Sequence, residues 1–185
     1  MTARPLTLPL VLLACLWSGS GVAQRASPED VAREHFAALQ SKGMRAVVEY
    51  MHPDALAEFK TMVMPIFEEE EKAGQRSLRS VTFDATITIE EIRALAPDVF
   101  MNGFMNLVLA RTEDVSLSFD QIEIVGVVPE GEQRHVLARI TIGANELSIT
   151  QFEVLSFVPF ENTWRMKLTG ELQGLASALR QQLGR

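Results

Sequence analysis

Two polar residues, Gln151 and Glu153, interrupt an apolar strand pattern and are the residues best placed to do chemistry. Apolar residues alternate from Leu147 to Phe157, and alternate residues of a strand point to one face of a sheet. Both polar residues fall on that apolar face. A carboxylate there needs a cation, a water-filled cavity or a raised pKa. The pattern therefore predicts a pocket lined by Gln151 and Glu153.

A second interpretation of the same stretch stays open. A bulge at Gln151 would turn Glu153 to solvent and bring Phe152 and Val154 inward. If Glu153 instead faces a pocket, its raised pKa suits a general base, and Tyr50 or His35 would then stabilise an oxyanion. Nothing in the spacing of these residues requires that pairing. His35 lies on an apolar helix stripe, where a core histidine with one hydrogen bond is the simpler interpretation.

Residues 98–111 form a helix rich in Met and Phe. Phe104 and Met105 on this helix, together with Trp164, are candidates for the wall of a ligand pocket beside Gln151 and Glu153. Met adapts its shape to a ligand, which favours a binding surface. The alternative is that these side chains are ordinary core residues.

Four antiparallel strands are predicted between residues 115 and 168. The apolar positions of the first strand change phase near Asp120-Gln121, which indicates a bulge. A two-residue loop at Ala144-Asn145 would pair Ile140 with Ile149. A second hairpin, centred on Glu161-Asn162, would pair Phe157 with Met166.

Helices are predicted on both sides of these strands. Ser27-Pro28 begins the first helix and Thr88 begins a later one, each as an N-cap followed by carboxylates. Residues 68–71 are four glutamates, interpreted as a solvated helix face, while residues 75–80 suggest a loop and residues 81–85 an extended segment. Leucines from Leu172 to Leu183 indicate a C-terminal helix. The predicted class is α+β, with N-terminal helices packed on a curved antiparallel meander of about four strands, and a C-terminal helix.

The N-terminus has the pattern of a secretory signal peptide. Arg4 precedes an apolar run of residues 6–17, and small residues lead to Ala23. Cleavage after Ala23 would leave residues 24–185 as a single domain in the periplasm or outside the cell. The alternative is a lipoprotein anchored at Cys15, which the bulky Leu16-Trp17 pair disfavours.

Charge and motifs exclude several function classes. The 185 residues include 17 basic and 24 acidic ones, a net charge of −7, which disfavours binding to nucleic acid. No segment after the signal peptide is long and apolar enough to span a membrane. The three histidines show no ligand spacing and nucleotide-binding and hydrolase motifs are absent, so no metal and no cofactor are expected.

The order of helices followed by a meander, with Pro53-Asp54-Ala55-Leu56 and Trp164-Arg165 as weak motifs, resembles the nuclear transport factor 2-like superfamily, which includes ketosteroid isomerases. The resemblance covers about residues 27–170. It implies a cone-shaped α+β fold in which helices close over a concave sheet and leave a pocket. Fold alone does not fix function.

Three functions follow from these observations. The first is an exported, non-catalytic domain that binds a small apolar ligand or a protein partner in or around the concave sheet. The second is an isomerase- or dehydratase-like enzyme with Glu153 as general base. The third is a structural homodimer formed through the apolar outer face that carries Phe152.

Export gives the first testable prediction. The protein isolated from the envelope of its host is expected to begin at Gln24, because small residues precede that bond. Intact-mass spectrometry measures this directly. A mass that includes Met1, or a lipid on Cys15, would contradict cleavage after Ala23.

Overall fold

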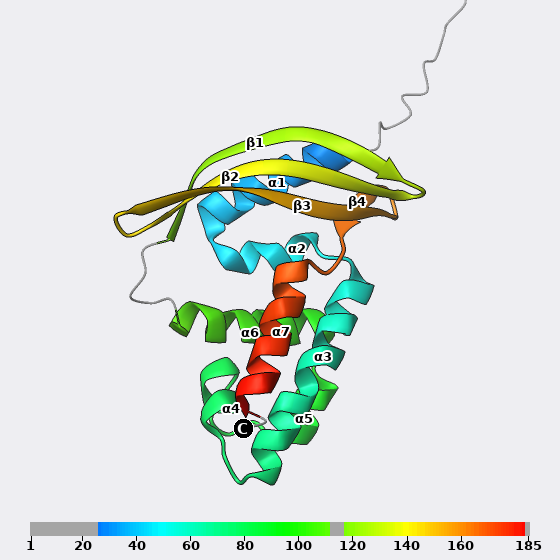
Figure 1. Ribbon diagram of the computed structural model, residues 1–185. Helices are drawn as coiled ribbons and strands as arrows, with labels where there is room; N and C mark the ends of the chain where they lie inside the picture. Colours follow the sequence, from blue (N-terminus) through cyan, green and yellow to red (C-terminus); the bar gives the residue numbers. More distant parts are fainter. Residues whose placement is uncertain (1–25, 112–116, 184–185) are drawn as a thin grey trace, which may run out of the picture.

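The structure is a computed structural model that describes residues 26–111 and 117–183 (Figure 1). The predicted signal peptide, its cleavage site and Cys15 lie outside these residues. The elements in chain order are α1 (Pro28–Lys42), a 3₁₀ turn (Met44–Ala46), α2 (Val47–Tyr50), α3 (Pro53–Lys72), α4 (Ser77–Thr82), α5 (Ile89–Ala94), α6 (Pro97–Arg111), β1 (Leu117–Glu130), β2 (Gln133–Ala144), β3 (Leu147–Phe160), β4 (Thr163–Met166) and α7 (Gly170–Leu183). The predicted α+β class, with helices before an antiparallel meander and a helix after it, is confirmed.

The four strands form one arched antiparallel sheet in the order β1-β2-β3-β4, and the helices lie beneath its concave side (Figure 1). The inner face is apolar and almost fully buried at Val136, Ala138, Ile140, Leu155, Phe157 and Met166. On the outer face Phe152 and Val154 are exposed. Burial of one face specifies the register of each strand, because a slip of one residue would turn its apolar row to water.

Bulges shape β1. The pairing with β2 shifts between Phe119 and Gln121, which confirms the predicted bulge, and shifts again between Ile124 and Gly126, which was not predicted. Each bulge adds local bend and twist to a strand. Two of them in one strand account for part of the curvature of the sheet.

The predicted register of the β2–β3 hairpin is wrong by two residues. The loop is Asn145-Glu146 rather than Ala144-Asn145, so Ile140 pairs with Gln151 and not with Ile149. Asn145 supplies the left-handed backbone that the loop needs, with φ of 55°. A shift of two residues leaves each side chain on its predicted face. The second hairpin pairs Phe157 with Met166 as predicted.

Helix caps follow the sequence closely at two helices. The Ser27 side chain accepts from the backbone N–H of Asp30, and Thr88 does the same for Glu91, so both form capping boxes. The N-cap of α3 is His52, whose Nδ1 accepts from the N–H of Asp54. That helix continues through Pro65 to its end.

Phenylalanines fill the helical half of the molecule. The rings of Phe59 and Phe104 lie 4.9 Å apart and edge to face, which joins α3 to α6. Phe83 and Phe100 form a second contact, at 5.5 Å. Gly103 is needed there, because a Cβ at this position would overlap the Phe83 ring.

The glutamate run is not a uniformly solvated face, which corrects the prediction. Glu69 is exposed, but Glu70 is buried at the end of α3. Its carboxylate accepts from the N–H groups of Leu78 at 2.5 Å and Arg79 at 3.1 Å. It thereby caps α4, where residues 75–85 were predicted as a loop and an extended segment. The buried Arg79 guanidinium lies 3.6 Å from Glu70.

Backbone contacts join the segment after α2 to the last strand. Met51 and Met166 form an isolated parallel bridge, and the His52 N–H donates to the Met166 carbonyl at 2.7 Å. The Arg165 guanidinium also donates to the Glu49 carbonyl. The segment between α2 and α3 therefore lies against β4.

Replacing Glu70 by Ala is expected to lower the free energy of unfolding by about 3 kcal/mol. The substitution leaves the N–H groups of Leu78 and Arg79 without their acceptor at the start of α4, and it removes one of the two carboxylates beside the buried Arg79 guanidinium. Urea denaturation measures this value. The matched control is Glu69→Ala, at the neighbouring exposed position, which should change stability by less than about 0.5 kcal/mol. Equal effects of the two substitutions would contradict a structural role for Glu70.

Candidate functional site

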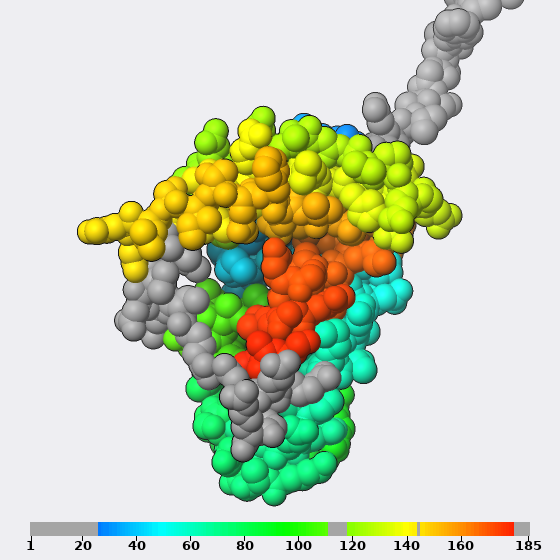
Figure 2. Space-filling model, in the orientation of Figure 1, coloured from blue at the N-terminus to red at the C-terminus, as the bar shows by residue number. Residues whose placement is uncertain are grey.

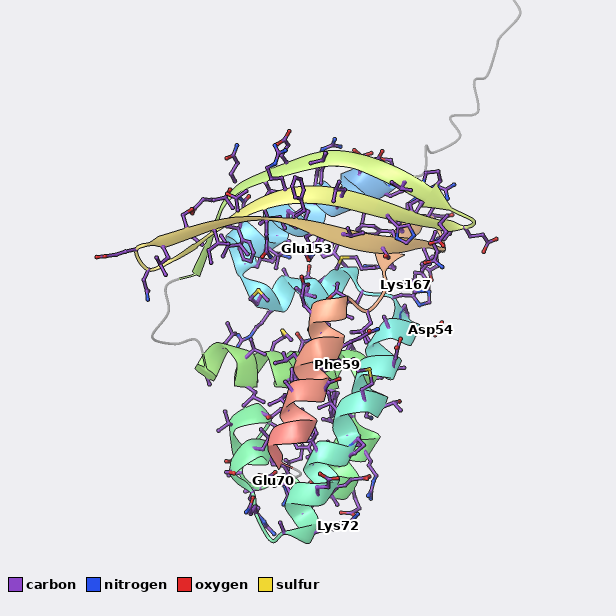
Figure 3. The ribbon with its side chains drawn as sticks, viewed as in Figure 1. Asp54, Phe59, Glu70, Lys72, Glu153 and Lys167 are labelled. Carbon is purple, nitrogen blue, oxygen red and sulfur yellow. The ribbon has the colours of Figure 1, made fainter. Side chains whose placement is uncertain are left out.

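Glu153 faces the concave side of the sheet. It pairs with Ala138, which is fully buried on the inner face, and the β2–β3 ladder runs from Leu147 to Phe157 without a shift in register. The alternative of a bulge at Gln151 that turns Glu153 to solvent is therefore wrong. Figure 3 shows the Glu153 side chain leaving β3 toward the helices below it.

A hollow opens beneath β3. Figure 2 shows it between the sheet above, α7 on one side and α6 below, with the N-terminal helical segment at its back. In the same orientation, the Glu153 carboxylate lies at the upper rim of this hollow (Figure 3). We call this space, bounded by β3, α6 and α7, the sheet hollow.

The environment of Glu153 disfavours its ionised form. Burial removes water from the carboxylate, and Glu171 in the first turn of α7 adds a second negative charge, so the pKa of Glu153 rises to about 7. Among the residues that the structure describes, none donates a hydrogen bond to Glu153 or forms an ion pair with it. The half-buried carboxyl group is therefore available to a molecule in the sheet hollow.

The inner face beyond Glu153 is open and mostly apolar. Gln151 is exposed there, two residues along β3. Ile149 and Leu147 follow on the same face, with exposed fractions of 57% and 70%. Gln151 and Glu153 thus lie on the same face of β3, as predicted, with apolar side chains beside them.

The other predicted ligand residues lie apart from this wall. Phe104 and Met105 are each only 1% exposed, and Phe104 packs against Phe59 in the helical core. Trp164 is half-buried on the short strand β4, where the Arg134 guanidinium lies 5.6 Å from its ring centre. Contact of these three residues with a ligand stays a prediction.

The predicted oxyanion donors, His35 and Tyr50, contact each other. The His35 and Tyr50 rings contact edge to face at 5.2 Å. The charges that act on the Tyr50 hydroxyl are those of Glu34, Glu49, Lys42 and Arg165, while Glu171 acts on Glu153. No hydrogen bond or ring contact of the described residues joins either ring to Glu153.

His35 has the properties of a buried neutral ring. It is 3% exposed, and burial lowers its pKa to about 4. Its Nδ1 has no hydrogen-bond partner in the described part of the chain, so the expected hydrogen bond is missing at that nitrogen. The role of His35 as an oxyanion donor stays a prediction.

Glu171 is the residue of this site that sequence reasoning missed. Its position in the first turn of a helix has a local explanation, since a carboxylate there interacts favourably with the helix dipole. Only the packing of α7 on α3 brings it near Glu153. Residues 26–111 and 117–183 contain no cluster of three His, Cys, Asp or Glu residues placed to hold a metal ion, and none of their helices has the length and hydropathy needed to cross a bilayer.

The raised pKa of Glu153 predicts a pH-dependent stability. A carboxyl group whose pKa is higher in the folded state favours folding below about pH 4.5 and loses that contribution as pH rises through about 7. Glu153→Gln should therefore gain roughly 1–3 kcal/mol relative to the native protein between pH 4.5 and pH 8. Urea denaturation at both pH values measures the difference.

The control for this measurement is Glu146→Gln, because Glu146 is exposed at the tip of the β2–β3 hairpin. Its stability relative to the native protein should not change between the two pH values. A Glu153→Gln variant that behaves like this control would show that Glu153 titrates normally. Glu171→Gln should lower the pKa of Glu153, as an NMR titration would report.

Comparison with known proteins gives no assignment: no protein-family model matches this chain, and no curated protein matches it either.

Proposed function

We propose that this protein is an exported, non-catalytic domain that binds a small, mostly apolar ligand in the sheet hollow. One observation carries the proposal: Glu153 is half-buried, has no hydrogen-bond or ion-pair partner among the described residues and lies at the rim of the hollow. A desolvated carboxyl group costs stability unless something compensates it. A ligand that donates a hydrogen bond to Glu153 supplies that compensation.

The residues around the sheet hollow restrict the chemistry of the ligand. Ile149 and Leu147 offer apolar contact area, which favours an apolar body. Glu153 and Glu171 place two carboxyl groups at one end of the wall, which disfavours an anion. The expected ligand is therefore neutral or cationic and carries at least one N–H or O–H group.

Binding is favoured over catalysis by the surroundings of Glu153. A pKa near 7 suits a general base, which keeps the isomerase- or dehydratase-like alternative as a second proposal. Such a reaction also needs a donor for the developing oxyanion. The proposed donors Tyr50 and His35 pack against each other, and no contact of the described residues joins either of them to Glu153.

The rest of the proposal comes from the sequence. The signal-peptide pattern supports export, and the meander beneath which helices pack is what the resemblance to nuclear transport factor 2-like proteins implies. A pocket on the concave side of the sheet is the place where that resemblance expects a ligand.

A pair of matched fluorescent probes tests the proposal. N-phenyl-1-naphthylamine is neutral, apolar and carries one N–H group, while 8-anilinonaphthalene-1-sulfonate adds an anionic sulfonate to the same rings. Residues 24–185 should enhance the fluorescence of the neutral probe and bind it roughly tenfold or more tightly than the anion at pH 8. Fluorescence titration measures both affinities.

Variants assign the probe to the sheet hollow. Ile149→Asp adds a charge to the apolar inner wall and should remove binding of the neutral probe. Val128→Asp is the matched control, because Val128 is 60% exposed on the outer face. Unchanged binding of the neutral probe to the Ile149→Asp variant, or no fluorescence enhancement with the native protein, would contradict the proposal.

A further inference from the structure

Most of β3 has a free edge. β4 pairs only with Phe157–Phe160, and no other described strand pairs with the remaining side of β3. The Lys167 N–H donates to the Ser156 carbonyl at 2.8 Å, so the backbone of Ser156 points toward this edge. Alternate residues of an antiparallel strand point the same way. The N–H and C=O groups of Ser148, Thr150, Phe152 and Val154 therefore face the open edge.

The opposite edge of the sheet is protected. β1 carries two register shifts and Pro129, all of which oppose pairing with a further strand. The Gln40 side chain also donates to the Phe119 carbonyl at 2.8 Å. The two edges therefore differ: β1 has register shifts and a proline, and the segment of β3 that β4 leaves unpaired has neither.

The free segment of β3 has the composition of a pairing surface. Residues 147–156 contain no Lys, Arg or Pro, and Glu153 is their only charged residue. The large apolar side chains are exposed on both faces: Leu147 and Ile149 on the inner face, with Phe152 at 59% and Val154 at 55% on the outer face. A long, regular, apolar edge of this kind promotes pairing with another strand.

We propose that a second copy of this chain adds to this edge, with residues 150–154 of the two β3 strands antiparallel about a two-fold axis at Phe152. Pairing stops there because Lys167 and β4 occupy the edge from Ser156 onward. The two sheets then become one eight-stranded sheet. Phe152 lies opposite Phe152 of the second copy, and Thr150 lies opposite Val154. Gln151 of each copy lies opposite Glu153 of the other on the inner face.

Side-chain complementarity selects this register. Faces match only in every second register, because residues on one face must meet residues on the same face. An axis at Glu153 would place two carboxyl groups opposite each other, and an axis at Gln151 would place Glu153 opposite Ile149. The axis at Phe152 stacks two aromatic rings and gives Glu153 an amide donor.

Self-complementarity is also the reason for choosing a second copy over a foreign peptide. Glu153 lacks a donor among the described residues of its own chain, and the Gln151 amide is exposed two residues away on the same strand. Two-fold pairing brings these groups together twice. In a non-hydrogen-bonded pair such as this one, opposite side chains approach closely. The pairing and a ligand in the sheet hollow are compatible, because the two oxygens of one carboxylate accept from more than one donor.

Analytical ultracentrifugation of residues 24–185 tests the pairing, and a dimer at micromolar concentration is expected. Thr150→Pro removes an N–H group that faces the free edge, so the dissociation constant should rise roughly tenfold or more while the circular dichroism spectrum is unchanged. Val128→Lys, on the outer face away from this edge, should leave the dimer intact. A monomeric native protein, or a Thr150→Pro dimer of native affinity, would overturn the inference.

A charge exchange tests the register. Gln151→Glu places two carboxylates opposite each other at both symmetric pairs and should weaken the dimer about tenfold or more at pH 8. Adding Glu153→Gln to that variant restores one carboxylate and one amide at each pair, so the native affinity should return. Failure of the double variant to recover would rule out the axis at Phe152, because an axis at Gln151 would keep Glu opposite Glu.

Discussion

The unbroken pairing of β2 with β3 is the constraint on which the site depends. This ladder determines which face of the sheet each residue of β3 occupies. Glu153 lies opposite the buried Ala138, so its side chain must point to the inner face. The inner face must stay in register because most of it packs on the helices. The same pairing that buries Leu155 and Phe157 therefore also places a carboxyl group where the helices no longer fill the space beneath the sheet.

Burial has opposite effects at two glutamates of this chain, because one has hydrogen-bond donors and the other has none among the described residues. Glu70 receives two backbone N–H groups and lies beside a guanidinium, so its burial stabilises the join between α3 and α4. Glu153 is half-buried near the carboxylate of Glu171, and no described group donates a hydrogen bond to it. Satisfied carboxylate oxygens stabilise the fold around Glu70, whereas the unsatisfied carboxyl group of Glu153 is costly to the fold.

Local signals predicted much of this fold, and long-range packing accounts for what they missed. The caps at Ser27 and Thr88 depend on residues within one turn, so the sequence shows them directly. The alternation of apolar residues along β3 predicts which face Glu153 occupies. The same alternation fits two hairpin registers that differ by two residues, so it could not show which residue pairs with Ile140. Helix α4 is capped by a side chain of α3, and Glu171 approaches Glu153 only through the docking of α7, so neither has a local signature.

The bridge between Met51 and Met166 has a consequence for the order of folding. Each strand of the meander pairs with its neighbour in sequence, so the sheet can assemble by closing short loops. The hydrogen bond from Arg165 to Glu49 joins residues 116 positions apart, and the entropy of closing so long a loop opposes its early formation. Docking of the N-terminal helices onto β4 then comes late. In a chain that is synthesised from its N-terminus, this contact cannot form until the final strand has emerged, whereas α1 can contact β1 and β2 earlier.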